Sequence, residues 1–411
     1  MNTKNLLFTL LFTLLLPFAC DNQPTEIPVI DMDNPSGFID LKISDLLEDI
    51  SIVALENNDD LVLSIARMTY TVTDRYILVN TGEKLLQFDR KGKYIRTLAF
   101  VGNGPNEISG GISNLLVDEK RETLYFTDFR GMQSISAIHL PTGTFQEFIK
   151  PDLKSFSIQQ IDSHGNMYGF LSPSLSIEAL TGQTSKAPDS LILAFRYNPD
   201  DLAVTAYTGH HGFPSEGTRK AMFRQGEQIF FCVNAYSDTL FAIKGDIIIP
   251  QCVVKLKNPA IDIVKGGVSV KFMVSSAHAT IIEKNESRMD IQMDGNTISS
   301  INVYGETLAY LCLHQKGELQ TIRSITIDPL AKTIDMNDYL KERNGELPIS
   351  PIPSVSGLWG HYKVEAYNMI ALIDGALKGN KLSAIQRKTL EEVANQIDED
   401  SNPVLIIGKI K

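Results

Sequence analysis

The sequence predicts an all-β protein, and more narrowly a six-bladed β-propeller with a short C-terminal helix. Short runs rich in Ile, Leu, Val, Phe and Tyr recur between clusters of Gly, Asp, Asn and Pro, which is typical of strands and turns. Comparable points in this pattern lie roughly 45 to 60 residues apart, a period that suits a four-stranded blade with inserted loops. Helical periodicity stays weak until the end of the chain.

The chain begins with a segment typical of a bacterial lipoprotein signal. One cation, Lys4, precedes an uncharged apolar run over 6–16 that is too short for a membrane span and suits a signal peptide. The following residues 16–20, Leu-Pro-Phe-Ala-Cys, resemble a lipobox, in which cleavage precedes an acylated cysteine. Leucine usually stands three residues before that cysteine, where this chain has Pro17. We expect a signal peptide over 1–19 and a lipid on Cys20; the alternative is an ordinary secretory signal with an incidental cysteine.

The residues after Cys20 predict a tether followed by a single large domain. Residues 20–36 are polar and proline-rich at their start and form the expected lipidated tether, and residues 37–411 form the expected propeller domain. Several acyl chains hold a protein stably on a bilayer. We therefore expect a location in the bacterial cell envelope, at the outer membrane, on either its periplasmic or its outward face.

The charge balance limits the partners of this body. A formal charge of −11 and a pI near 5.2 argue against nucleic acid and against anionic lipid headgroups, so the expected membrane contact is the lipid on Cys20 alone. Three further cysteines remain, Cys232, Cys252 and Cys312, and an odd number excludes a fully paired disulfide framework. Because Cys232 and Cys312 lie in apolar runs, buried free thiols are expected.

The mature chain divides into strand-like runs. The clearest are Arg75–Asn80, Lys84–Asp89, Thr123–Asp128, Leu191–Tyr197, Gln228–Val233 and Thr239–Ile243. An Asp-x-x-Gly turn closes the pattern in Lys84–Tyr94, and Ala137–Phe145 repeats it with Pro-Thr-Gly. Six such units leave room for a polar insert at Ser172–Pro188, while the fifth and sixth blades fall across Lys271–Ile327 and beyond Leu358. A β-sandwich or a pair of smaller β domains is the alternative.

The one helical pattern lies near the C-terminus. Its apolar face consists of Leu382, Ile385, Leu390, Val393 and Ile397. Ser383 is the expected N-cap, because a serine hydroxyl accepts a hydrogen bond from a free backbone N–H of the first turn.

Several motifs together resemble a known family. They are Asp40–Ile50 (DLKISDLLEDI), Val53–Glu56 (VALE), Phe88–Lys93 (FDRKGK), Gly102–Glu107 (GNGPNE) and Asp398–Gly408 (DEDSNPVLIIG). They are similar to the ends and the first two blades of a family of six-bladed β-propeller lipoproteins from Bacteroides-type gut bacteria. This resemblance implies the fold and leaves the activity open, since that family has no agreed function. Because a propeller closes when its two ends share a blade, we expect Val404–Ile410 to pair with Ile50–Leu55.

The glycine loop permits two interpretations. Gly102, Gly104 and Pro105 lie where backbone N–H groups could receive a phosphate. The loop lacks the Lys-Ser/Thr of a P-loop, and no helix pattern follows it. We favour a structural turn in which the glycines take positive φ and Pro105 fixes the exit.

The histidines and the single tryptophan are the other chemically suggestive residues. His210 and His211 are adjacent in a Gly/Pro-rich loop, but neighbouring side chains on an extended chain point in opposite directions, which disfavours a shared metal ion. Trp359 suits a sugar platform or, more commonly, a core position. Five histidines are scattered singly: His139, His164, His278, His314 and His361. Residues 31–34 lack the glycine and glutamate of a calcium loop and fit a solvated linker.

These observations predict no catalytic residue, no metal site and no cofactor. The leading hypothesis is a membrane-anchored, non-catalytic module that binds a glycan, a peptide or a partner protein through loops of several blades. The alternative is a propeller hydrolase or lyase acting on polysaccharide, with carboxylates and a histidine converging in one funnel. A third hypothesis, a scaffold subunit of an envelope complex, predicts a large exposed apolar patch.

Overall fold

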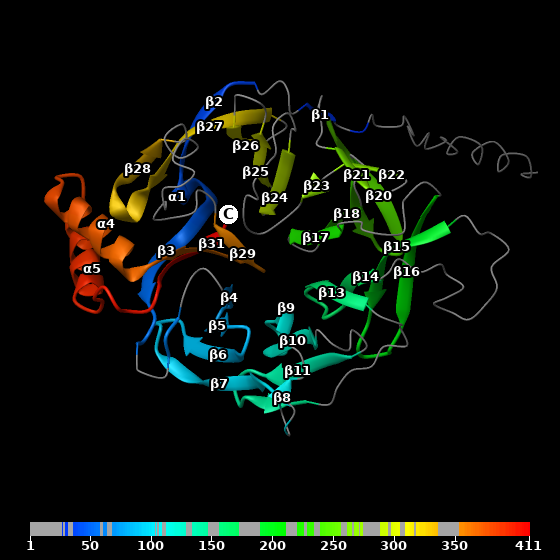
Figure 1. Cartoon of the computed structure of the whole chain (residues 1–411), viewed down its shortest axis with the longest axis horizontal. Coiled ribbons are helices and arrows are strands. Elements are labelled where there is room, and N and C mark those ends of the chain that lie inside the picture. The colour runs from blue at the N-terminus through cyan, green and yellow to red at the C-terminus, as the bar shows by residue number, and fades with distance from the viewer. Residues whose placement is uncertain are drawn as a thin grey trace, which may run out of the picture.

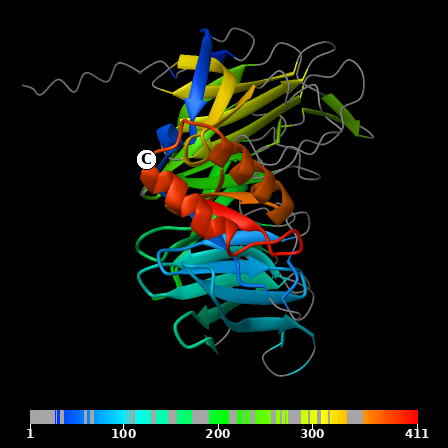
Figure 2. The ribbon, with the colours of Figure 1, turned by 90° about the vertical axis from the view of Figure 1, so that its left-hand side faces the viewer.

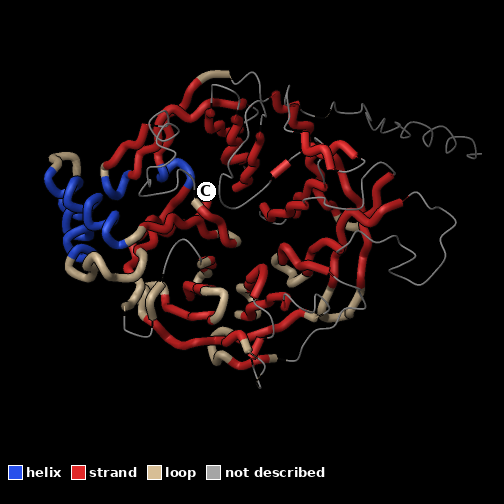
Figure 3. The backbone as a smooth tube through the Cα atoms, in the orientation of Figure 1, coloured by secondary structure: helices blue, strands red, loops and turns tan. Residues whose placement is uncertain are grey.

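The described part of the protein consists mainly of β-strands arranged around a common centre (Figure 1). A computed structural model of the chain describes residues 27, 29–31, 36–57, 61–63, 68–102, 104, 107–108, 112–128, 134–146, 156–171, 190–210, 220–225, 228–233, 239–255, 261–264, 267–270, 272–273, 288–294, 297–304, 309–315, 318–335 and 353–411. In the sheets formed by residues 69–108, 112–145, 156–210 and 220–255, the first strand lies nearest the centre and later strands lie further out, as Figure 3 also shows. The all-β prediction is confirmed.

Three sheets follow one another through the first half of the chain. The β4–β8 sheet contains β4 (Thr69–Val72), β5 (Tyr76–Asn80), β6 (Lys84–Asp89), β7 (Tyr94–Val101) and β8 (Glu107–Ile108). The β9–β12 sheet contains β9 (Ile112–Asp118), β10 (Thr123–Asp128), β11 (Ile135–His139) and β12 (Thr144–Phe145). The β13–β16 sheet contains β13 (Phe156–Ile161), β14 (Met167–Leu171), β15 (Ser190–Tyr197) and β16 (Val204–His210).

The second half of the chain forms the remaining sheets. The β17–β20 sheet contains β17 (Lys220–Gln225), β18 (Gln228–Val233), β19 (Thr239–Lys244) and β20 (Ile247–Lys255). The β23–β27 sheet contains β23 (Phe272–Met273), β24 (Arg288–Asp294), β25 (Thr297–Tyr304), β26 (Ala309–Gln315) and β27 (Glu318–Ile327), with β28 (Lys332–Asp335) paired to β27. The β29–β31 sheet contains β29 (Ser354–Ser356), β30 (Trp359–Val364) and β31 (Val404–Ile410). A separate hairpin pairs β21 (Ile261–Val264) with β22 (Gly267–Val270).

The strand predictions agree closely with these bounds. β6, β10 and β18 begin and end where the sequence predicted, and β5, β15 and β19 differ by one residue at one end. The loosely placed later units correspond to the β23–β27 sheet and to β30 with β31. The insert predicted at 172–188 lies outside the described residues.

The hydrophobic core lies between neighbouring sheets. One cluster joins the β4–β8 and β9–β12 sheets through side chains such as Leu85 and Phe126, and another joins the β9–β12 and β13–β16 sheets through Tyr125 and Phe156. Further clusters join the β13–β16 sheet to the β17–β20 sheet, and the β29–β31 sheet to the β4–β8 sheet. Because both faces of such sheets are covered, β14 is buried at every position.

The two ends of the chain share one sheet. β31 pairs antiparallel with β3 (Leu47–Ala54), with Ser51 opposite Ile407 and Ala54 opposite Val404. β31 also pairs with β30 on its other side, so that it is an interior strand of the four-stranded order β29–β30–β31–β3, and its residues 404–408 are buried. The predicted pairing of the C-terminal segment with the residues around Ile50–Leu55 is therefore present.

The N-terminal segment adds two further strands in parallel to outer strands. β1 (Val29–Asp31) pairs with β20, and β2 (Phe38–Lys42) pairs with β27. The first of these lies within the region expected to be a tether. An edge strand offers unpaired N–H and C=O groups to any extended segment nearby, which explains why so short a run is recruited.

The described helices gather on one side of the molecule (Figure 2). They are α1 (Ile43–Leu46), the 3-10 turn η1 (Asp328–Leu330), α4 (Ala366–Lys378) and α5 (Ala384–Ala394). α5 is the predicted C-terminal helix, and Ser383 is its N-cap: the Ser383 hydroxyl accepts from the Gln386 N–H at 3.2 Å. α4 was not predicted. Both helices pack on the core cluster beside β3 and β31.

Candidate functional site on the turn face

One end of the sheets gathers the turns that follow their first and third strands. In an antiparallel sheet these turns lie at the same end, because each strand reverses the direction of the chain. We call this end the turn face and define it by the β4–β5, β6–β7, β9–β10, β11–β12, β13–β14, β15–β16 and β19–β20 turns. The contacts described below join turns of neighbouring sheets, so that the face is continuous across these sheets.

Three sheets meet on the turn face around Trp359. The Trp359 indole N–H donates to Asp74 Oδ1 at 2.8 Å, and the Asp74 backbone N–H donates to Glu119 Oε1 at 3.0 Å. The Arg90 guanidinium lies over the Trp359 ring, 3.8 Å from its centroid, and donates to the Thr73 carbonyl at 2.5 Å. This junction therefore connects the β29–β31, β4–β8 and β9–β12 sheets.

Glu119 is the most perturbed carboxyl group of this junction. Partial removal of the carboxyl group from water, together with a smaller effect of the nearby carboxylates of Asp74 and Asp118, raises its pKa to about 7. The N–H of Asp74 and the charge of Arg90 act in the opposite direction. A carboxyl group that titrates near neutrality is suited to proton transfer.

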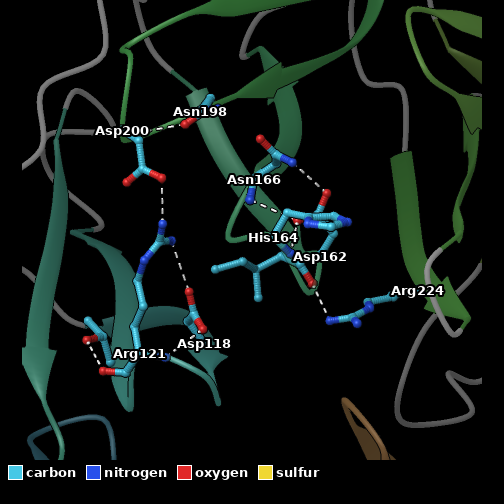
Figure 4. A network of polar contacts seen from close by, with 10 residues as sticks. Asp118, Arg121, Asp162, His164, Asn166, Asn198, Asp200 and Arg224 are labelled. Carbon is cyan, nitrogen blue, oxygen red and sulfur yellow. Dashed lines mark hydrogen bonds and ion pairs between the residues drawn. The ribbon is translucent and has the colours of Figure 1, made fainter.

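Arg121 connects the next two turns (Figure 4). Its guanidinium donates to Asp118 Oδ2 at 3.1 Å and to Asp200 Oδ2 at 2.6 Å. A Cβ added to Gly165 would lie 1.8 Å from Arg121 Nη1, so the side chain crosses directly over the β13–β14 turn. Glycine is favoured at position 165 by its φ of +82°, and its lack of a side chain also lets Arg121 pass close above the turn.

The β13–β14 turn itself is built around the buried carboxylate of Asp162. Its Oδ1 accepts the backbone N–H groups of His164 and Asn166, and its Oδ2 accepts the Asn166 amide and the Tyr168 hydroxyl. Gly165 has φ +82° and completes the turn. All four of these hydrogen bonds to the Asp162 carboxylate come from the turn or from β14 directly after it, so Asp162 has a structural role.

The β6–β7 turn repeats this arrangement. Asp89 Oδ1 accepts the N–H groups of Lys91 and Lys93, and Gly92 has φ +84°. The Asp-x-x-Gly turn recognised in the sequence at Asp89 is therefore also present at Asp162, where it positions His164 at the surface.

Ion pairs cross successive sheet junctions at this end. Arg75 pairs with Glu122, Arg121 with Asp200, and Arg196 with Asp246 at 2.8 Å. Each exposed pair contributes roughly 0–1 kcal/mol, so their main effect is to hold the turns in register. The result is a polar surface whose charged groups come from distant parts of the chain, an arrangement able to bind a polar ligand without rearranging.

Trp359 is a junction residue in this structure. Arg90 covers its ring, its N–H is bound to Asp74, and the side chain packs against the core cluster that contains Tyr70 and Ile407. These contacts support the core interpretation of Trp359 over the sugar platform, because a stacking sugar would have to displace Arg90.

The glycine loop differs from the sequence expectation in its backbone. Neither Gly102 nor Gly104 is among the residues with positive φ. A Cβ at Gly102 would lie 2.0 Å from Glu107 Oε2, so a larger residue here would displace the Glu107 carboxylate. The Gly104 N–H donates to that carboxylate at 2.6 Å, so Glu107 occupies the place where a phosphate would be received. Pro105 lies outside the described residues.

The single histidines lie in different environments. His139 Nδ1 is 2.9 Å from the Thr142 hydroxyl in the β11–β12 turn, and His164 is exposed on the β13–β14 turn. His361 is buried against the Tyr70 ring, and within the described residues its Nδ1 has no hydrogen-bond partner. Burial lowers the pKa of His361 to about 3, with a smaller contribution from the charge of Lys363.

The other residues singled out in the sequence lie outside the described residues or within strands. Cys20, His211 and His278 lie outside the described residues, while His210 ends β16 and His314 lies in β26. Cys232, Cys252 and Cys312 lie on β18, β20 and β26. The described part of the chain holds no group of three or more His, Cys, Asp or Glu residues placed to bind a metal ion. Within the same part, no helix is long and apolar enough to cross a membrane.

Sequence reasoning missed the residues that build the turn face. Asp74 and Glu119 lie in no recognised motif, and Arg90 lies within the Phe88–Lys93 motif without a role assigned to it, so only the fold brings the three together. Asp162 had a detectable signal, since Asp-Ser-His-Gly repeats the Asp-x-x-Gly pattern already recognised at Asp89.

The comparisons with known proteins identify a family and a fold. A family model described as "Domain of unknown function (DUF4934)" matches residues 24–409. A solved structure from Bacteroides fragilis, of a protein described as exported, is similar with a TM-score of 0.56 and 14% identity over 94% of this chain and all of that one. The WD40 repeats of RRP9 give a TM-score of 0.40 at 12% identity, covering 87% of this chain and 97% of that chain. No curated protein matches the sequence.

Proposed function

Because the chain belongs to the family described as "Domain of unknown function (DUF4934)", whose description assigns no activity, we propose a function from the structure itself. The protein is a lipid-anchored envelope protein whose β-propeller body binds a glycan, a peptide or a partner protein on its turn face and leaves that ligand unchanged.

Six blades are part of this proposal. The β4–β8, β9–β12, β13–β16, β17–β20, β23–β27 and β29–β31 sheets are the proposed blades, and the shared sheet of β3 and β31 is the proposed closure of the ring. The placement of core clusters between neighbouring sheets supports this assignment, since blades of a propeller pack face to face.

The proposed location in the cell rests on the N-terminal sequence. The apolar run over 6–16 and the lipobox-like residues before Cys20 support acylation of that cysteine. The acidic body, with a formal charge of −11, supports membrane contact through the lipid and not through basic side chains. The outer membrane is the proposed location.

The observation that carries the binding function is the polar turn face. Side chains from turns of successive sheets are fixed there by ion pairs, as in Arg75–Glu122 and Arg121–Asp200. A surface assembled in advance loses little conformational entropy when a ligand binds. Lys91, Lys120 and His164 are exposed on this face and are the groups proposed to contact the ligand.

Binding arrays test this function. The mature chain carrying Cys20→Ser would be applied to an array of polysaccharides and to an array of peptides. For any ligand that binds, a triple variant with Lys91→Ala, Lys120→Ala and His164→Ala should lower affinity by at least tenfold. The control is a double variant of two exposed residues, Lys381 between α4 and α5 and Lys388 in α5, each changed to alanine, which should bind normally. If the two variants bound with equal affinity, the ligand would not bind on the turn face.

A second candidate function is a hydrolase or lyase acting on polysaccharide. It is favoured by one observation, the Glu119 carboxyl group with a pKa near 7 beside Asp74, because paired carboxyl groups of different pKa serve as acid and base in such enzymes. Consumption of a bound glycan by the wild-type protein and its loss with Glu119→Gln would establish this function. A bound glycan recovered intact supports the binding module.

A further inference from the structure

β16 has a long outer edge that no other described strand covers. The outer strands of three other sheets each pair with a short extended segment: β7 with β8, β20 with β1, and β27 with β2. α5 packs against the outer strand β3, and β12 has only two residues. β16 has seven residues and, among the described strands, pairs with β15 alone at the outer side of its sheet (Figure 1).

The register shows which backbone groups of β16 point away from β15. The Asn198 N–H donates to the Ala203 carbonyl at 2.9 Å and closes the β15–β16 turn. In an antiparallel pair, residues alternate between those whose N–H and C=O groups point to the neighbouring strand and those whose groups point away. The groups of Val204, Ala206 and Thr208 therefore point outward, and the bulge in this pair lies on β15 and does not change the alternation on β16. Within the described part of the chain these outward groups make no hydrogen bond.

The composition of β16 lacks the features that usually protect an exposed edge. Natural proteins block such edges with charged side chains, especially lysine, with proline, or with a covering segment. The sequence of β16 is Val-Thr-Ala-Tyr-Thr-Gly-His, which contains no acidic residue, lysine, arginine or proline. Ala206 and Thr208 are exposed, whereas Tyr207 is buried and its hydroxyl donates to the Gly245 carbonyl at 2.9 Å. The strand is thus held firmly by its own side while its outer edge stays open.

This edge is complementary to a second copy of itself. In an antiparallel pairing with a two-fold axis at Ala206, this residue lies opposite Ala206 of the copy, and Val204 lies opposite Thr208. The outward N–H and C=O groups then meet in about six backbone hydrogen bonds. Thr205 comes opposite Tyr207, an aromatic and β-branched pair that stabilises neighbouring strands. The pairing brings no like charges of β16 together, although the chain has a formal charge of −11.

The side chains beside the edge favour a second copy over a peptide ligand. Domains that add a peptide strand to a sheet obtain their specificity from pockets for alternate side chains of the peptide. The exposed side chains of Ala206 and Thr208 are too short to build such pockets. A two-fold pairing needs none, because its specificity lies in the register of the strand with itself.

We propose that β16 pairs antiparallel with β16 of a second copy, centred on Ala206, and that the two β13–β16 sheets join into one continuous sheet. The contact uses neither Cys20 nor the turn-face residues Lys91, Lys120 and His164, so it goes beyond the proposed function and does not rest on it. A single strand edge buries less than the roughly 1,600 Å² of a standard stable interface. The expected dissociation constant is therefore on the order of micromolar.

Sedimentation equilibrium of the mature chain carrying Cys20→Ser tests this pairing. We expect a monomer–dimer equilibrium over concentrations from about 1 to 100 µM. Ala206→Lys would place two cations directly opposite each other and should weaken the dimer at least tenfold. The control Ile385→Lys adds the same charge on α5, at a side chain that is 80% exposed, and should associate as the wild type does. Thermal unfolding followed by circular dichroism shows whether each variant is folded.

A cysteine at position 206 gives a second measurement if Ala206→Lys folds poorly. Opposite residues in such a hydrogen-bonded pair have Cα atoms about 5.5 Å apart, which a disulfide can bridge. Oxidised Ala206→Cys should form a covalent dimer, whereas Ile385→Cys should form no more than the wild type with its own cysteines. A chain that stays monomeric up to about 100 µM, or a dimer that Ala206→Lys leaves intact and Ala206→Cys does not crosslink, would overturn the pairing. Neither result would alter the lipid anchor or ligand binding on the turn face.

Discussion

The indole N–H of Trp359 donates to Asp74 Oδ1 at 2.8 Å although the two residues lie 285 positions apart in the chain. This bond joins the β29–β31 sheet, in which the C-terminal strand β31 pairs with β3, to the β4–β8 sheet. The Asp74 backbone N–H then binds Glu119 of the following sheet. One short series of contacts thus connects three sheets.

Removal of the indole N–H should weaken this junction without disturbing its packing. Trp359→Phe keeps an aromatic ring beneath Arg90 and against the core but cannot donate to Asp74. We expect a loss of about 1 kcal/mol in the free energy of unfolding. Urea unfolding followed by circular dichroism measures it, because the variant has no tryptophan fluorescence. Ile385→Ala, at an exposed helix position, is the control, and equal losses in the two variants would contradict the role of the bond.

Glu119 should make the protein less stable as the pH rises toward neutrality. Its folded-state pKa is raised to about 7, so the folded protein favours the neutral carboxyl group. The stability linked to this group is present below the unfolded pKa near 4.5 and is lost as the pH rises through 7. Since the carboxyl group is only partly withdrawn from water, solvent screening reduces the expected effect to about 1 kcal/mol.

Glu119→Gln isolates this effect. Glutamine keeps an oxygen that can accept the Asp74 N–H but does not ionise. Urea midpoints measured from pH 4.5 to 8 should change less for Glu119→Gln than for the wild type, with the variant more stable above pH 7. An unchanged pH profile would show that Glu119 titrates normally in the folded protein.

His361 should make the protein less stable as the pH falls below neutrality. Its pKa is lowered to about 3 because the ring is buried, so the folded protein favours neutral imidazole. The stability linked to this group is present above the unfolded pKa near 6.5 and is lost as the pH falls toward 3, by at most about 1.4 kcal/mol per pH unit. His361→Phe keeps a ring beside Tyr70 and should flatten the decline in the urea midpoint between pH 6.5 and 4.5. The exposed control His164→Phe should leave that decline as steep as in the wild type.

The sequence predicted those parts of the fold that depend on local chemistry. β6 and β18 were located to the residue because β-forming side chains and turn residues are neighbours in the chain. α5 was predicted because Ser383 and an apolar face mark it locally. α4 was missed: its N-cap, Glu365, makes no side-chain capping bond, and Gly375 lies in its interior.

The candidate site required information that neighbouring residues do not contain. Asp74, Glu119 and Trp359 come from three separate sheets, and no spacing in the sequence indicates that they meet. The parallel strands β1 and β2 pair with residues more than two hundred positions away, so their short sequences were interpreted as a tether and a family motif. Repetition was the usable signal, as the turns at Asp89 and Asp162 show.

Two glycines with similar φ allow the cost of backbone strain to be measured separately from the cost of a steric collision. Gly82 has φ +86° and nothing within 4 Å of an added Cβ, whereas Gly92 has φ +84° and a Cβ there would lie 2.0 Å from the Ala54 carbonyl oxygen. Gly82→Ala should cost about 1 kcal/mol, the cost of left-handed backbone alone. Gly92→Ala should cost several kcal/mol, because β3 must move away from the β6–β7 turn. Equal urea midpoints for the two variants would show that the turn can shift without cost.

Asn402 should be the most sensitive single polar residue near the C-terminus. It is 2% exposed; its amide donates to the carbonyls of Glu56 and Leu61, each at 2.7 Å, and its oxygen accepts the Leu63 N–H at 2.8 Å. Asn402→Ala would leave three backbone groups without these bonds, and each buried unpaired group costs about 1–3 kcal/mol. We expect a loss of at least 3 kcal/mol, against less than 0.5 kcal/mol for Asn395→Ala at the exposed end of α5.

Hydrogen exchange distinguishes this local role of Asn402 from a general loss of packing. Val404–Ile410 follows Asn402 directly and lies between β30 and β3, so global destabilisation would accelerate exchange throughout β31. If Asn402 acts through the bonds described, the Leu63 N–H should lose its protection in Asn402→Ala under conditions where the β31 amides remain protected. Equal acceleration at Leu63 and in β31 would instead show that Asn402 supports the pairing of the two chain ends as a whole.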